Sequence, residues 1–196
     1  MGHEIRGLTI GIVGVGNIGQ RVAKLAAAFG MQVLGYDPLL DGVELTDRGV
    51  EPVGLQELIA RSDVVSLHCP LNDQTRNLFD ASQFAAMKRG ATFLSTARGG
   101  IHDEQALAEA LESGHLSGAG LDVWMVEPPA DSHPLLRMDN VVATYHTAGV
   151  THEARRNAAR MGAQQLVEVL SGRQPPRLVN LQAWPSFLKR YESMFG

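Results

Sequence analysis

Short apolar runs and longer amphipathic stretches alternate along the chain as far as residue 170. The apolar runs predict strands that are buried on both faces, over 8–13, 32–36, 63–68, 91–96, 117–123 and 141–144. Apolar residues at helical spacing predict helices between them, over 18–29, 55–61, 81–87, 103–112 and 152–170. Strand-then-helix order with short connections predicts an α/β fold, a doubly wound parallel sheet covered by helices on both sides.

The composition indicates a protein that acts on a small molecule. The 196 residues carry a formal net charge of −4 with no long run of either sign, which argues against a nucleic-acid or membrane-surface partner. No apolar run approaches the roughly 18 residues of a membrane helix, and the first residues lack the apolar core of a signal peptide. A single cysteine excludes an internal disulfide and is typical of a reducing compartment, so we expect a cytoplasmic location. No set of His, Cys, Asp or Glu has metal-ligand spacing, so we expect no metal.

A glycine-rich motif, GVGNIG over residues 14–19, lies between the first expected strand and the first expected helix. Gly14 would permit a tight turn, Gly16 would let the backbone approach a pyrophosphate, and Gly19 would let the helix pack close to the strand. The free N–H groups at the start of the helix would then face the phosphates. This motif in this place predicts a dinucleotide-binding site.

An acidic residue, Asp37, ends the second expected strand about 20 residues beyond the glycine motif. A carboxylate at this position accepts hydrogen bonds from the ribose hydroxyls of adenosine and repels a 2′-phosphate. We therefore expect NAD as the cofactor in preference to NADP. The alternative interpretation is a glycine-rich turn in an α/β fold that binds nothing, with Asp37 a plain turn residue before Pro38.

Several motifs occur together in a particular order along the chain: GIVGVGNIGQ, GYDP, SLHCPLNDQT, STARGG followed by DE, GLDVWMVEP, HPLL and TYHTAG. From about residue 8 to residue 180 the chain resembles the cofactor-binding domain of the D-2-hydroxyacid dehydrogenases. The resemblance implies a Rossmann-type dinucleotide-binding domain over 1–180. It leaves 181–196 as a C-terminal tail, the remnant of the segment that returns to a substrate-binding lobe.

The resemblance implies that three residues carry the chemistry: Arg98, Glu127 and His146. A guanidinium at Arg98 would hold a 2-oxoacid by its oxygens and polarise the carbonyl toward hydride attack. His146 would protonate the carbonyl oxygen as the hydride arrives, and Glu127 would orient the imidazole. Without the resemblance, Arg98 is equally well a surface arginine. A lone histidine such as His146 is more often structural, and Glu127 is an ordinary loop carboxylate.

Further positions correspond by the resemblance to contacts with NAD. Asn17 and Ile18 belong to the phosphate turn, and Asp122 would accept a hydrogen bond from the nicotinamide carboxamide. For Asp122 alone, a carboxylate that caps the end of a strand is the other interpretation. The remaining positions expected to lie beside the cofactor are Cys69, Pro70, Thr75, Thr96 and Ala97.

The chain also departs from the family pattern. Ser95 stands where the family usually has Asn, with a hydroxyl able to bond to the neighbouring backbone, and Tyr145 stands where it usually has Pro. The resemblance further implies that most of a second, substrate-binding lobe, normally N-terminal to this domain, is missing. Family members dimerise through the cofactor domain, so we expect a homodimer in which the segment 127–136 reaches across.

Two functions of different classes follow. The first is an oxidoreductase that transfers a hydride between NAD(H) and a 2-hydroxyacid/2-oxoacid pair. The second is a non-catalytic NAD-binding module that acts as a sensor or a dimerising partner, or an inactive truncated gene product. The presence of Arg98, Glu127 and His146 together favours the first, whereas the missing lobe favours the second. The sequence does not indicate which 2-hydroxyacid is used.

Overall fold

The computed structural model describes residues 3–195, which form two compact units. The first unit ends at Ala148 and the second begins at Gly149. The first unit therefore ends before residue 180, where the resemblance puts the end of the cofactor domain. The assignment of 149–180 to that domain stays a prediction.

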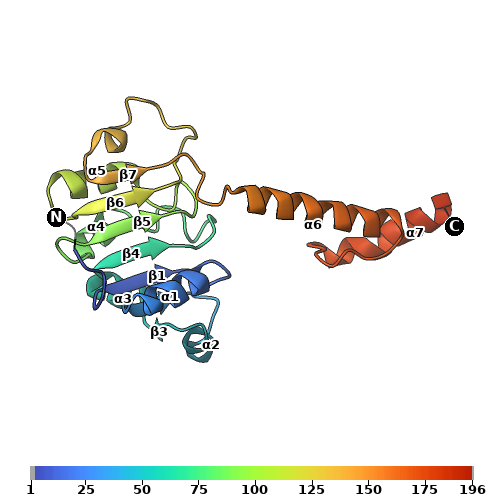
Figure 1. Cartoon of the computed structure of the whole chain (residues 1–196), viewed down its shortest axis with the longest axis horizontal. Coiled ribbons are helices and arrows are strands. Elements are labelled where there is room, and N and C mark those ends of the chain that lie inside the picture. The colour runs from blue at the N-terminus through green and yellow to red at the C-terminus, as the bar shows by residue number, and fades with distance from the viewer. Residues whose placement is uncertain (1–2, 196) are drawn as a thin grey trace. The chain divides into compact units, whose positions relative to one another are not determined.

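The first unit is built on one sheet of seven parallel strands (Figure 1). The strands are β1 Thr9–Val13, β2 Gln32–Tyr36, β3 Glu51–Pro52, β4 Val64–Leu67, β5 Thr92–Ser95, β6 Gly118–Leu121 and β7 Val141–Ala143. Their order across the sheet is β3-β2-β1-β4-β5-β6-β7, so the direction of winding reverses between β1 and β4. The predicted doubly wound parallel sheet is confirmed. Ligands in this architecture bind outside the carboxyl ends of the strands, at the reversal point.

Helices cover both faces of the half of the sheet that holds β1 and β2. The helices of this unit are α1 Gly19–Ala28, α2 Gly42–Asp47, α3 Leu55–Arg61, α4 Ala81–Ala86, α5 Glu104–Glu112 and the 3-10 turn η1 Pro134–Arg137. Ile10 and Ile12 of β1 pack with α1 and α2, whereas Val13 belongs to the larger core beneath α3, α4 and α5. Successive side chains of a strand point to opposite faces, so a continuous apolar run fills two cores.

Two elements lie in the stretch after β2 where the sequence predicted only a polar connection. Helix α2 begins at a capping box, in which Asp41 accepts a hydrogen bond from the Glu44 N–H and the Glu44 side chain accepts one from the Asp41 N–H. The two-residue strand β3 pairs with β2 at the edge of the sheet. The strand is too short to show alternation, and the helix has a single buried residue, Leu45, in a polar stretch.

The second unit consists of α6 His152–Leu170, the 3-10 turn η2 Leu181–Ala183 and α7 Trp184–Phe195. Thr151 caps α6 by accepting a hydrogen bond from the Ala154 N–H. Figure 1 shows α7 beside α6. The Tyr191 hydroxyl of α7 donates a hydrogen bond to the carbonyl of Leu170, the last residue of α6. Over residues 3–195, no helix is both long and apolar enough to span a membrane.

Candidate functional site

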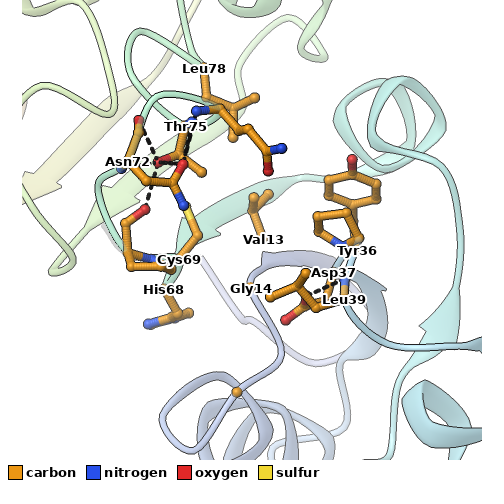
Figure 2. Close-up of a pocket in the computed structure, with 14 residues that line it drawn as sticks. Val13, Gly14, Tyr36, Asp37, Leu39, His68, Cys69, Asn72, Thr75 and Leu78 are labelled. Atoms are coloured by element: carbon orange, nitrogen blue, oxygen red, sulfur yellow. Dashed lines mark hydrogen bonds between the residues drawn. The ribbon is translucent and has the colours of Figure 1, made fainter. Parts of the chain in front are cut away.

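A cavity of about 530 Å³ opens at the carboxyl ends of β1, β2 and β4 (Figure 2). Six of the residues expected beside the cofactor line it: Gly14, Gly16, Asp37, Cys69, Pro70 and Thr75. Figure 2 shows Tyr36 and Asp37 on one side and Cys69 and Thr75 on the other. The cavity therefore lies where the reversal in winding predicts a ligand.

The glycine motif forms a tight turn between β1 and α1. Gly14 has a φ of 90°, a left-handed conformation, and a Cβ at this position would lie 2.6 Å from the backbone nitrogen of Cys69. A Cβ on Gly19 would overlap the Gly14 carbonyl oxygen, whereas a Cβ on Gly16 would meet open space. Gly14 and Gly19 thus serve the packing of the turn, and Gly16 leaves its surface free for a ligand. Asn17 is exposed on the same turn.

Asp37 is held by two backbone groups at the rim of this cavity. One carboxylate oxygen accepts a hydrogen bond of 3.0 Å from the Val15 N–H, and the other accepts one of 3.0 Å from the Leu39 N–H. Arg48 donates to the Val15 carbonyl oxygen at 2.7 Å. The N–H and the carbonyl of Val15 are therefore both held by side chains. The Asp37 carboxylate is a positioned acceptor with lone pairs left for a ligand.

The opposite wall is the loop that follows β4. The Thr75 hydroxyl donates to the Pro70 carbonyl at 2.6 Å and accepts from the Asn72 N–H at 2.8 Å, which folds the loop over the cavity. Burial raises the pKa of the Cys69 thiol to about 11, and the nearby Asp37 charge adds to this effect. Cys69 is therefore protonated at neutral pH and is a small apolar wall residue rather than a nucleophile.

A second cavity, of about 510 Å³, lies next to the first and shares His68, Cys69 and Pro70 with it. Ile18, Leu71, Thr96, Ala97 and Arg98 also line it. Ile18, Thr96 and Ala97 are among the residues expected beside the cofactor, and Arg98 is the expected catalytic arginine. The Arg98 side chain is exposed, and its Nη1 donates to the Ala97 carbonyl at 2.6 Å. Among the residues that the structure describes, the remaining donors of the guanidinium have no hydrogen-bond partner, so they are available to an anionic ligand.

His146 and Glu127, which are 19 positions apart in the sequence, meet in space. The His146 Nδ1 lies 2.8 Å from Glu127 Oε2, and the other carboxylate oxygen accepts a hydrogen bond of 3.1 Å from the Trp124 N–H. The hydrogen bonds from His146 and Trp124, with the charges of His146 and Arg98, lower the pKa of the Glu127 carboxyl. An ionised Glu127 favours the tautomer with the proton on Nδ1, and within residues 3–195 the His146 Nε2 has no hydrogen-bond partner.

Asp122 anchors the segment that carries His146. Its carboxylate accepts hydrogen bonds from the Thr144 hydroxyl, from the Thr147 N–H at 2.8 Å and from the Ala148 N–H at 2.9 Å. Its carbonyl oxygen accepts from the His146 N–H, and His146 itself has a φ of 56°. A non-glycine residue is uncommon in this left-handed region and persists where the surroundings impose it. These contacts match the strand-end cap, and the contact with the carboxamide stays a prediction.

Replacing Asp122 with Asn is expected to lower the free energy of unfolding at pH 7 by about 2–3 kcal/mol, because the amide cannot accept all three bonds. Burial raises the pKa of the Asp122 carboxyl, but the hydrogen bonds from Thr144, Ala148 and Thr147 and the charge of His146 lower it more, so the net pKa lies below 3.8. The stability due to the carboxylate is complete above that value and is lost as the pH falls through the native pKa.

Urea unfolding of wild type and Asp122→Asn from about pH 7 to about pH 2 measures this contribution. The difference between the two proteins should shrink in the most acidic part of the range. The matched control is Asp139→Asn, at an exposed position. A difference between wild type and Asp122→Asn that does not change with pH would contradict the role of the charge.

Some lining residues and contacts were not expected from the sequence. Tyr36, Leu39, His68, Asn72, Gln74 and Leu78 also line the first cavity, and their only signal is their place at or after a strand end. The suggested bond from Ser95 to the backbone is wrong, because its buried Oγ has no hydrogen-bond partner within 3–195. In the same residues, no group of three His, Cys, Asp or Glu is arranged to hold a metal ion.

The family model for the NAD-binding domain of D-isomer specific 2-hydroxyacid dehydrogenases matches residues 1–148. The chain belongs to this family. The match coincides with the first compact unit and includes every residue of the site described above. It confirms the resemblance found in the sequence motifs and the expectation of an NAD-binding domain.

Curated relatives and solved structures agree with this assignment. The chain is 43% identical to D-3-phosphoglycerate dehydrogenase of Methanocaldococcus jannaschii over 94% of its own length and 35% of the relative's. It is 49% identical to hydroxypyruvate reductase of Thermotoga maritima over 79% of its own length and 50% of the relative's. D-lactate dehydrogenase from Lactobacillus jensenii, solved with NAD+, superimposes with a TM-score of 0.84 at 32% identity, over 92% of this chain and 58% of that one. The chain thus spans about a third to just over half of the length of these proteins.

The cofactor of this domain family is NAD, and the residues of this chain fit it. The turn packs too tightly for side chains at Gly14 and Gly19 yet is open at Gly16, as a backbone surface for phosphates requires. Asp37 presents a fixed carboxylate beside the first cavity, and its recognition of the adenosine ribose stays a prediction.

Proposed function

We propose that this chain forms the cofactor-binding and catalytic part of an NAD-dependent oxidoreductase that interconverts a 2-hydroxyacid and a 2-oxoacid. The observation that carries the proposal is the pair formed by His146 and Glu127. It lies at the edge of the sheet that also bears the glycine turn and Arg98, whose charge lowers the pKa of Glu127. A module that only bound NAD would have no use for an oriented imidazole there.

The residues that would hold the cofactor follow the two adjoining cavities. Gly16, Asn17 and Ile18 would offer backbone N–H groups to the pyrophosphate, and Asp37 would accept hydrogen bonds from the adenosine ribose. Cys69, Pro70 and Thr75 would flank the adenosine, and Thr96 and Ala97 would flank the nicotinamide ribose. When bound, the reduced nicotinamide supplies a hydride, which adds to the carbonyl carbon of the 2-oxoacid.

The protein groups would then manage charge and protons. Arg98 would bind the carboxylate and draw electron density from the carbonyl through its free N–H donors. His146 would deliver a proton from Nε2 to the oxygen that becomes the hydroxyl, while Glu127 holds the opposite nitrogen. In the direction of oxidation, Nε2 would take that proton back.

A homodimer in the cytoplasm is part of the proposal. Next to the segment expected to reach a partner, Met125 and Val126 are exposed apolar residues, and Val142 is exposed on the edge strand β7. Exposed apolar side chains in this part of the chain support contact with another protein surface. Sedimentation equilibrium of the purified chain tests the dimer, and a monomer at every concentration would contradict it.

The direct test of the proposed function is oxidation of NADH by the purified chain in the presence of glyoxylate, hydroxypyruvate or pyruvate. We expect loss of absorbance from NADH with at least one of these 2-oxoacids and none without a 2-oxoacid. Binding of NADH without oxidation by any of them would support the non-catalytic module instead. The same assay with NADPH in place of NADH checks the choice of cofactor.

A further inference from the structure

Trp124, in the loop after β6, is buried and contacts the segments of all three candidate catalytic residues. Its backbone N–H donates to Glu127 at 3.1 Å, and its indole Nε1–H donates at 2.9 Å to the carbonyl of Thr144, two residues before His146. Its own carbonyl packs against Gly99, which follows Arg98. We propose that Trp124 is a positioning residue that fixes the positions of Arg98, Glu127 and His146 relative to one another. This inference rests on the function proposed above.

The contact with the Arg98 segment is made by backbone alone. A Cβ at Gly99 would overlap the Trp124 carbonyl carbon and oxygen, so the two chain segments lie flush against each other. Gly100, the next residue, has a φ of 80°, and a Cβ there would lie 3.4 Å from the Met125 sulfur. The loop that carries Arg98 therefore cannot move toward Trp124 without displacing it.

The contact with the His146 segment depends on the indole ring itself. The Thr144 hydroxyl donates a hydrogen bond to Asp122, and the Thr144 carbonyl oxygen accepts one from the indole N–H. An aromatic ring without an N–H fills much of the same volume but leaves that carbonyl without this donor. The segment carrying His146 would then keep its hydrogen bonds to Asp122 and lose the one between Thr144 and the Trp124 indole.

The indole is fixed from its other side by a second histidine–carboxylate pair. Glu104, the first residue of α5, accepts a hydrogen bond of 2.7 Å from the Met125 N–H and lies 3.1 Å from the His133 Nε2. The His133 ring meets the Trp124 ring edge to face, with centroids 5.3 Å apart. Glu104 thus holds the loop at Met125 and at His133, which lie before and after Glu127 in the sequence. These contacts restrict the movement of the Trp124 ring.

The experiment compares wild type, Trp124→Phe and Trp184→Phe, with the same chemical change in α7 as the matched control. Proton–nitrogen correlation spectra of the histidine rings at a pH where His146 is neutral report which of its nitrogens carries the proton. In wild type and Trp184→Phe we expect the proton on Nδ1, facing Glu127. In Trp124→Phe we expect a mixture of the two tautomers, because the imidazole is no longer held against Glu127.

The kcat for 2-oxoacid reduction should fall about tenfold in Trp124→Phe, with the Kd for NADH within about twofold of wild type.

The tautomer of His146 tests the role of Trp124 without a measurement of enzymatic turnover. A folded Trp124→Phe protein with the proton of His146 wholly on Nδ1 would overturn it, whatever its affinity for NADH. Failure of wild type to bind NADH would instead refute the proposed function and leave the tautomer measurement to decide about Trp124. If Trp124→Phe does not fold, Glu104→Ala takes its place, because this change removes the support of the indole and keeps a helix-forming residue in α5. The expected and contradicting results are then the same.

Discussion

Replacing His146 with glutamine is expected to lower the rate of 2-oxoacid reduction by NADH about 10²- to 10⁴-fold, because the carbonyl oxygen loses its proton donor. The affinity for NADH should stay within about twofold of wild type, since His146 lines neither of the two cavities assigned to the cofactor. Initial rates at saturating NADH and a fluorescence titration with NADH on the same protein preparation measure the two quantities.

Two further variants show whether the loss belongs to the pair. Glu127→Gln keeps an oxygen that accepts the Nδ1–H but removes the charge, so we expect a smaller loss than in His146→Gln, of about tenfold or more. His152→Gln makes the same substitution at the exposed start of α6 and should leave the rate unchanged. Wild-type turnover by His146→Gln would show that the proton comes from another group.

Replacing Gly14 with alanine is expected to weaken NADH binding at least tenfold and to destabilise the fold by about 1–3 kcal/mol. The new Cβ would meet the backbone of the neighbouring segment 2.6 Å from the Cys69 nitrogen, and a left-handed φ of 90° strains any residue with a side chain. Thermal unfolding with and without NADH separates the two effects, because a bound ligand raises the Tm only of a protein that can bind it.

Gly16→Ala is the informative comparison for this prediction. A Cβ at Gly16 meets open space in this structure, so the Tm without NADH should stay close to that of wild type. The NADH affinity should still fall, because the methyl group would occupy the surface reserved for the pyrophosphate. Gly54→Ala, where a Cβ also meets open space, serves as the control away from the cavity. Tight NADH binding by both Gly14→Ala and Gly16→Ala would refute the role of this turn.

The fold could be predicted closely because the apolar pattern carries it. The predicted second strand, 32–36, and the helices over 55–61 and 152–170 agree with β2, α3 and α6 to the residue. Strands buried on both faces leave an unbroken apolar run, and the helices between them are long enough to show their period. The edge strand β3 was missed because two residues show no alternation, and helix α2 was missed because its one buried residue, Leu45, stands in a polar stretch.

The site was less accessible to sequence reasoning than the fold. Spacing alone indicated the glycine turn and Asp37, because both belong to one unit of β1, α1 and β2. The meeting of His146 with Glu127 depends on how the loops after β6 and β7 fold together, and only the family resemblance indicated it. Trp124 and Glu104 went unnoticed because their contacts reach as far as 29 residues along the chain and depend on side-chain packing that no spacing encodes.

The central claim, that this chain binds NAD through the glycine turn and Asp37, is tested most directly by titrating it with NADH and NADPH and following nicotinamide fluorescence. We predict NADH binding in the micromolar range and NADPH binding weaker by about tenfold or more, because the fixed Asp37 carboxylate repels a 2′-phosphate. Equal affinities would contradict the role assigned to Asp37. Binding of neither nucleotide by the folded chain would contradict the account as a whole.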